Sequence, residues 1–214
     1  MKQRVAVVTW TLVLLNVIVF LWDRQGHIFG PGYVFADLSM RPREVVAAVM
    51  GRDDKFPLVT LFTSIFLHAN ITHLVGNMIF LVVFGSGIED ALGSAWFAGL
   101  YLLWGFAASS AQIYVDPHSA VATLGASGAI GGIMGSYFLM FPGNKVEIFI
   151  AFMSFEVSAW ILLGLWFLWQ IFGKQEGVAN WAHAGGFLAG MVTILVLGGR
   201  KKLLKDRPDL EYEF

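Results

Sequence analysis

Long apolar blocks separated by polar connections dominate the chain. The first block, 5–22, is broken by polar side chains only at Thr9, Thr11 and Asn16. No small-residue cleavage pattern follows it, so we expect a retained span rather than a signal peptide. The later blocks cover 71–87, 96–113, 127–141, 157–172 and 181–199. Each approaches the length of about 20 residues that a helix needs to cross the hydrocarbon of a bilayer. The pattern predicts a bundle of six transmembrane helices.

Two segments lie outside these blocks and differ from ordinary turns. The connection 23–70 holds prolines and charged side chains but also the apolar patch 45–50. This mixture favours short amphipathic pieces lying partly in the membrane interface, with a plain soluble linker as the alternative. The tail 200–214 begins with basic residues, which favour contact with anionic lipid, and ends with acidic ones. We expect residues 1–214 to form a single membrane domain.

The composition agrees with a polytopic membrane protein of the all-α class. Of 214 residues, 57% are hydrophobic and 14% charged, well outside the soluble range. The net charge of −1 gives no reason to expect a nucleic-acid partner. The absence of cysteine removes disulfides, thiol nucleophiles and thiolate metal sites. Any chemistry must therefore come from serine, histidine, asparagine or carboxylates.

Basic residues near the ends of the spans predict the orientation. Lys2 and Arg4 precede the first span, and Arg200, Lys201 and Lys202 follow the last. Because basic residues flanking spans favour the cytoplasmic side, we expect both termini to be cytoplasmic. The second, fourth and sixth spans then all begin at the outer face.

The unusual polar residues occur at the beginning of those three spans. His73 and Asn77 lie four residues apart on one helix face of the second span, Ser127 opens the fourth, and His183 lies near the start of the sixth. Helical rise places all of them within about 10 Å of the outer surface. A histidine inside a span is costly when charged and usually marks a functional site.

Glycines follow the serine and the histidine at intervals that allow two helices to approach closely. They are Gly128, Gly131 and Gly135 in the fourth span and Gly186 and Gly190 in the sixth. If the two stripes face each other, Ser127 and His183 come together. Taken alone, a serine in a membrane helix is usually bonded to a carbonyl one turn back.

These residue types favour acyl transfer. A neutral imidazole within hydrogen-bond reach can take the proton of a serine hydroxyl, which makes His183 a base and Ser127 a nucleophile. No acid lies in the outer half of any span, so a dyad is predicted. The Asn77 amide, the Ser127 backbone N–H and the His73 imidazole can supply oxyanion donors. No HExxH pair occurs, and no metal or other cofactor is expected.

Over roughly 5–199 the chain resembles the rhomboid intramembrane serine proteases. The motifs are H-x4-H-x3-N at His68, His73 and Asn77, GxSG at Ser127, and H-x2-G-x3-G at His183. Glu89 also matches an acidic position at the inner end of the second span. The resemblance implies hydrolysis of peptide bonds in or beside transmembrane helices, with serine as nucleophile, histidine as base and His73 and Asn77 at the oxyanion.

The resemblance also implies a membrane location and a class of substrate, and other functions stay open. We expect membrane-protein substrates in a prokaryotic plasma membrane, with the site toward the outer face and the oligomeric state open. One departure is Gly131, where many members carry an aromatic residue that packs against the histidine. The main alternative is a catalytically silent, client-binding relative. A transporter is disfavoured because the polar groups gather on one side of the bundle.

Overall fold

The structure is a computed structural model that describes residues 5–25, 28–29, 36–51, 54–150, 153–173, 177–205, 207 and 210. The predicted flanking charges Lys2 and Arg4, part of the connection 23–70 and the acidic end of the tail lie outside the described residues.

The described part is mostly helical. Its longer helices are α1 (Val7–Asp23), α4 (Ile71–Leu92), α5 (Ser94–Val115), α6 (Ser127–Met140), α7 (Ala159–Phe172) and α8 (Asn180–Val196). Shorter pieces are η1 (Ala36–Leu38), α2 (Pro42–Val49), η2 (Phe56–Leu58), α3 (Thr60–Thr63), η3 (Ser64–Phe66) and α9 (Gly199–Leu203). The described residues also form two strands, β1 (Lys145–Ile150) and β2 (Met153–Ser158).

The six predicted blocks each coincide with a long helix, but the ends differ. The second block continues to Leu92, five residues beyond the predicted end. Among the described residues, only α4 is both long and apolar enough to cross a membrane by length and composition. The apolar helices α1, α7 and α8 contain 17, 14 and 17 residues. Since about 20 residues span the hydrocarbon, the six-span arrangement stays a prediction.

The prediction of a purely helical chain missed the hairpin between α6 and α7. Strands β1 and β2 pair antiparallel, from Lys145 opposite Ser158 to Ile150 opposite Met153. Apolar and polar residues alternate along β2 and over Lys145–Ile148 of β1, which is the period of a half-exposed strand. The predicted fifth span therefore begins two residues early, because Val157 and Ser158 belong to β2.

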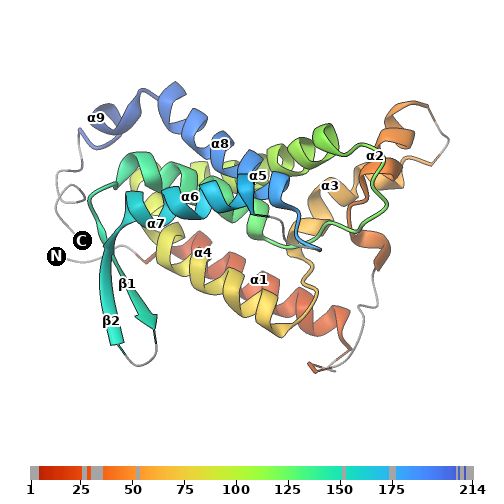
Figure 1. Cartoon of the computed structure of the whole chain (residues 1–214), viewed down its shortest axis with the longest axis horizontal. Helices are drawn as coiled ribbons and strands as arrows, with labels where there is room; N and C mark the ends of the chain where they lie inside the picture. Colours follow the sequence, from red (N-terminus) through yellow and green to blue (C-terminus); the bar gives the residue numbers. More distant parts are fainter. Residues whose placement is uncertain are drawn as a thin grey trace.

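Helix α6 lies at the centre of the molecule. Figure 1 shows α5, α6 and α8 running side by side, and α4 and α7 also contact α6. Every residue of α6 from Gly128 to Tyr137 is buried. Because neighbouring helices cover this helix on all sides, α6 is the core of the bundle.

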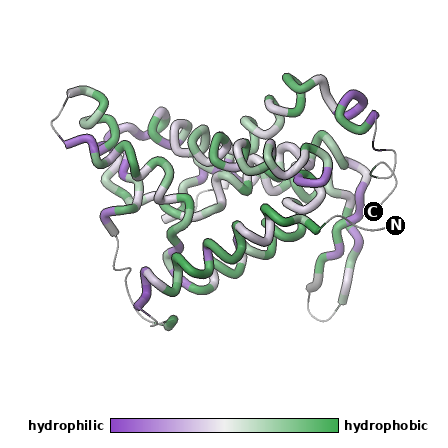
Figure 2. Tube along the Cα trace, turned by 180° about the vertical axis from the view of Figure 1, so that it is seen from behind, coloured by the Kyte–Doolittle hydropathy of each residue, from purple (hydrophilic) through white to green (hydrophobic). Residues whose placement is uncertain are grey.

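Large apolar side chains remain exposed on the outside of the bundle. Leu165 of α7 is 63% exposed and Val196 of α8 is 78% exposed, and α1 and α4 present similar residues. Figure 2 shows hydrophobic colouring along α1 and α4, while hydrophilic positions lie mainly at the two ends of the molecule, at the hairpin and α9 and around α2. So much exposed apolar surface is unusual for a soluble monomer and suits a lipid-facing bundle.

Helix α1 is fixed to α4 through Glu89, the acidic residue singled out in the sequence. The Glu89 carboxylate accepts hydrogen bonds from the backbone N–H groups of Val8 and Thr9, at 2.9 and 2.8 Å, and from the Thr9 hydroxyl at 2.8 Å. Ser94 donates a further bond at 2.6 Å. A carboxylate here satisfies N–H groups that the first turn of α1 leaves unpaired.

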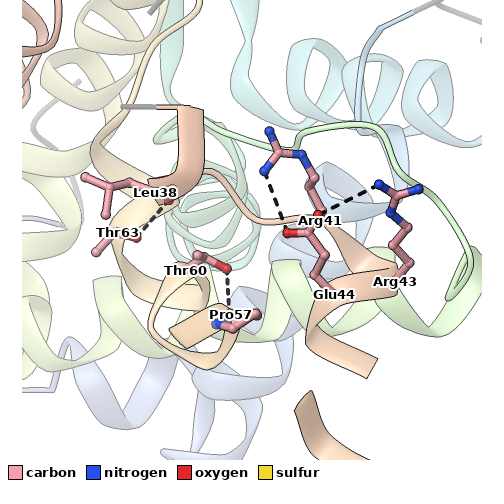
Figure 3. Close-up of polar contacts among 7 residues, drawn as sticks. All are labelled: Leu38, Arg41, Arg43, Glu44, Pro57, Thr60 and Thr63. Atoms are coloured by element: carbon pink, nitrogen blue, oxygen red, sulfur yellow. Dashed lines mark hydrogen bonds and ion pairs between the residues drawn. The ribbon is translucent and has the colours of Figure 1, made fainter. Parts of the chain in front are cut away.

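The segment from η1 to η3 braces the loop that leads into α6. Figure 3 shows Thr63 donating to the Leu38 carbonyl, at 2.8 Å, and Glu44 between Arg41 and Arg43, at 3.7 and 3.9 Å. Met40 and Thr123 exchange two backbone hydrogen bonds of 3.0 and 2.7 Å. This connection contains the short helices α2 and α3 and the 3-10 turns, and its position in the membrane interface stays a prediction.

Candidate active site

Ser127 is the first residue of α6 and lies at the end of a constrained loop. Gly125, two residues before Ser127, has a φ of +121°, a backbone conformation that residues other than glycine rarely adopt. Its N–H donates to the Ser64 carbonyl at 2.9 Å, which ties the loop to η3. Because Ser127 opens the helix, its own backbone N–H has no intrahelical acceptor. The residue therefore offers a hydroxyl and an N–H at one place.

His183 reaches Ser127 from the first turn of α8. The imidazole Nε2 lies 2.7 Å from Ser127 Oγ, across 56 positions of sequence. This is hydrogen-bond distance, so the structure brings together the two residues that were predicted to meet. A neutral imidazole with its lone pair on Nε2 can accept the hydroxyl proton in this arrangement.

Glycines allow this approach of α6 and α8. A Cβ added at Gly186 would overlap the Gly128 carbonyl oxygen, and one at Gly190 would overlap that of Gly132. Added Cβ atoms at Gly131 and Gly135 would meet the carbonyl oxygens of His183, at 2.8 Å, and of Phe187.

Gly128 departs from the prediction that the whole stripe faces α8. An added Cβ there would lie 2.7 Å from Ala108 Cβ, so the glycine's open side faces α5, while its carbonyl faces Gly186. One helix turn of α6 thus makes close contacts with two neighbours.

Gln170 is the residue that sequence reasoning missed. Its side-chain Oε1 lies 2.8 Å from His183 Nδ1, on the side of the ring opposite Ser127. Trp166, one turn earlier in α7, packs beside the same imidazole with ring centroids 5.8 Å apart. A signal was available, because Gln170 is the only amide in the otherwise apolar stretch Ala159–Phe172.

His73 and Asn77 lie beside the loop that carries Ser127. A Cβ added at Gly125 would be 2.8 Å from the His73 ring and 3.5 Å from Asn77 Nδ2. Asn77 is 8% exposed, and among the described residues its Nδ2 has no hydrogen-bond partner. A buried amide without an acceptor is a donor available to a ligand.

His68 supports this side of the site without facing Ser127. Its ring meets that of His73 edge to face, with centroids 5.1 Å apart, and the side chain is 1% exposed. Burial, reinforced by neighbouring His73, lowers the pKa of His68 to about 3, so the ring is neutral at physiological pH. Arg24 at the end of α1 donates to the carbonyls of His68 and Ala69 and fixes the approach to α4.

One cavity of about 790 Å³ connects these groups. Ser127, His183, His73, Asn77 and Gln170 all line it. A hydroxyl in contact with an imidazole, two further side chains with nitrogen donors and the first residue of a helix thus line a common space. This set of groups suits attack on a carbonyl carbon and stabilisation of the oxyanion that results.

Comparison with known proteins gives an independent result. A family model described as the Rhomboid domain matches residues 55–200. The chain is 30% identical over 145 residues to "Rhomboid protein 1, mitochondrial" of Saccharomyces cerevisiae, a match that covers 63% of the chain and 40% of that protein. It is 30% identical over 138 residues to "Rhomboid protease GluP" of Bacillus subtilis, covering 64% and 26%.

A longer match is to "Rhomboid protease GlpG" of Salmonella typhi, with 27% identity over 207 residues, covering 94% of the chain and 68% of that protein. The chain spans less than half the length of the yeast and Bacillus relatives.

Proposed function

This chain belongs to the rhomboid family and is an integral membrane protein, and from that premise we propose that it is an intramembrane serine protease. It cleaves peptide bonds in or next to transmembrane helices of other membrane proteins. The observation that carries the proposal is the 2.7 Å contact between Ser127 Oγ and His183 Nε2 inside a cavity lined by oxyanion donors. Relatives named as proteases support the reaction class.

The proposed reaction begins with Ser127. Its Oγ forms a bond to the carbonyl carbon of the scissile peptide while His183 Nε2 takes the hydroxyl proton. The carbonyl π electrons move to oxygen, and the tetrahedral intermediate breaks its C–N bond as His183 returns the proton to the leaving amine. Water then attacks the acyl-serine ester with His183 again as base, which releases the second product and restores Ser127.

The oxyanion would be held by three donors. Asn77 Nδ2 is buried without a partner, the Ser127 N–H is free of an intrahelical acceptor, and the His73 ring adjoins Gly125. Preorganised donors of this kind typically contribute about 2.7–4 kcal/mol each to the transition state. They act without reorganisation at the moment of reaction, because α4 and the brace at Ser64 already hold them in place.

The proposed setting follows the family. The six long helices form one rhomboid domain in a prokaryotic plasma membrane, with both termini cytoplasmic and the cavity toward the outer face. The connection 23–70 lies partly in the interface, and single-span or polytopic membrane proteins are the substrates. Exposed apolar residues on α1, α4, α7 and α8 are the surface expected against lipid.

Replacing Ser127 or His183 by alanine tests the proposal. In proteoliposomes with a model single-span substrate, Ser127→Ala and His183→Ala should each abolish cleavage, and a fluorophosphonate should label wild type but not Ser127→Ala. Ser136→Ala is a matched control, since Ser136 lies on the same helix and donates to the Gly190 carbonyl, at 3.2 Å. It should retain labelling.

The same experiment separates the alternative of a silent client-binding protein. That alternative predicts substrate binding without cleavage and no fluorophosphonate labelling of folded wild type. Equal cleavage by wild type and Ser127→Ala would end the claim that this serine is the nucleophile.

A further inference from the structure

At Gly131, one turn after Ser127, helix α6 has no side chain that could hold the His183 imidazole in place. Gly131 lies four residues after Ser127, and a Cβ there would already be 2.8 Å from the His183 carbonyl oxygen. Helix α6 therefore passes too close to the backbone of α8 for a side chain at this position to fit beside the ring. The imidazole must be oriented from elsewhere.

We propose that Gln170 is the positioning residue for the base, fixing the tautomer of His183 so that its lone pair points at Ser127. The inference rests on the proposed function and adds a third member to the dyad, an amide where a serine triad usually has a carboxylate. It depends on the 2.8 Å contact between Gln170 Oε1 and His183 Nδ1.

The hydrogen bonds of Gln170 set the direction of its amide. The Nε2 group donates to the Trp166 carbonyl one turn back, at 3.4 Å. A carbonyl oxygen can only accept, so the reversed amide would place two oxygens against each other. The nitrogen therefore faces Trp166 and the oxygen faces His183.

That direction determines the proton positions on the imidazole. Because Gln170 Oε1 can only accept, Nδ1 of His183 must carry the proton. In a neutral imidazole the other nitrogen is then unprotonated, so Nε2 accepts from the Ser127 hydroxyl at 2.7 Å. Ser127 therefore donates to His183, and His183 donates to Gln170. The direction of each hydrogen bond fixes the direction of the other.

The surroundings of Gln170 explain why a lone amide occupies an apolar helix. The side chain is 4% exposed, and burying an unpaired amide would be costly. Both ends of the amide are paired in this arrangement. Trp166 and Gln170 lie one turn apart on α7, so one helix face supplies both the packing partner and the acceptor for the ring.

The size of the effect follows from the neutral charge of the amide. A neutral hydrogen bond orients the ring but gives less stabilisation to an imidazolium than a carboxylate does. We expect removal of the acceptor to lower kcat roughly tenfold, the value of one neutral hydrogen bond. The KM should stay close to wild type, because substrate binding does not depend on the tautomer.

Substitution of Gln170 by residues of similar length is the first test. In proteoliposomes, Gln170→Met should lower kcat and the rate of fluorophosphonate labelling together. Gln170→Glu, which keeps an oxygen acceptor at the same reach, should recover most of the loss. Wild-type kcat in Gln170→Met would overturn the proposal.

Thr193→Val is the matched control for the loss of a buried hydrogen bond. Thr193 lies on α8, as His183 does, and accepts from Trp104 Nε1 at 3.0 Å. Its replacement should leave kcat unchanged. Equal kcat losses in Thr193→Val and Gln170→Met would show that Gln170 contributes only general stability and would also overturn the proposal.

Nitrogen NMR of wild type gives a readout that does not depend on any variant folding. With ¹⁵N-labelled histidine, and the His183 signals assigned by their loss in His183→Ala, Nδ1 should be the protonated nitrogen at neutral pH. Protonation at Nε2 instead would refute the inference even if Ser127→Ala is inactive. Loss of cleavage in Ser127→Ala tests the proposed function separately.

Discussion

Gly186→Ala is the substitution whose consequence follows most directly from the packing of α6 against α8. The added Cβ would overlap the carbonyl oxygen of Gly128, and both groups belong to helix backbones that cannot rotate away. Carbon and oxygen atoms in ordinary contact are separated by about 3.5 Å, so the helices must part by about 1 Å or more at this level. Gly186 lies three residues after His183, which places the displacement at the reacting pair.

The magnitude follows from the distance that the displacement alters. Ser127 Oγ and His183 Nε2 are 2.7 Å apart, and about 1 Å of separation exceeds the range of a hydrogen bond. A misplacement of that size can lower activity about 100-fold, equivalent to about 2.7 kcal/mol of barrier. Overpacking should also lower the free energy of unfolding by about 1–3 kcal/mol.

A series of glycine variants separates this effect from general intolerance of alanine. An added Cβ at Gly99 of α5 meets no atom within 4 Å, and one at Gly131 is 2.8 Å from the His183 carbonyl oxygen. Labelling rates with a fluorophosphonate should therefore rank Gly99→Ala near wild type, Gly131→Ala lower and Gly186→Ala lowest. A wild-type rate in Gly186→Ala, with the fold intact by thermal unfolding, would refute the reasoning.

Three further predictions address other parts of the structure. Asn77→Ala should lower kcat about 100- to 1,000-fold with little change in KM, because an unpaired oxyanion donor is lost, and an unchanged kcat would argue against that role. Glu89→Gln should lower the free energy of unfolding by about 1.5–3 kcal/mol, because four hydrogen bonds reach this buried carboxylate. An unchanged value in thermal or chemical unfolding would contradict the capping of α1. The free energy of unfolding should fall by about 1.4 kcal/mol per pH unit as pH drops from 6.5 toward about 3, because His68 binds a proton in the unfolded chain but not in the folded one. In a His68→Asn variant this contribution to the pH dependence of stability should be absent.

The apolar blocks could be found from the sequence because helix formation in these segments is a local matter. A run of apolar residues such as 96–113 forms a helix in any apolar surroundings, and the structure has α5 there. The glycines after Ser127 and His183 could likewise be interpreted from the sequence, because their small size and their spacing are enough to predict that two helices pack closely. The paired positions Gly186 and Gly128 agree with that prediction.

The division of the chain into apolar blocks did not reveal the hairpin, although the residue pattern of its strands is a local feature of the sequence. Apolar and polar residues alternate over Met153–Ser158 and over the first four residues of Lys145–Ile150, but each strand has only six residues and lies between two apolar helices. Short runs of mixed polarity are ambiguous between a strand and a connection.

Residue types and their spacing were enough to select Ser127, His183, His73 and Asn77 as candidates, because polar and ionisable groups are costly in such apolar segments. Which of their atoms come into contact depends on how the helices pack. Gln170 and His183 lie 13 residues apart on different helices, and their 2.8 Å contact depends on the crossing of α7 and α8 and on the rotation of each about its axis. Residue spacing fixes the face of one helix, whereas the pairing of two faces results from the packing of the whole bundle.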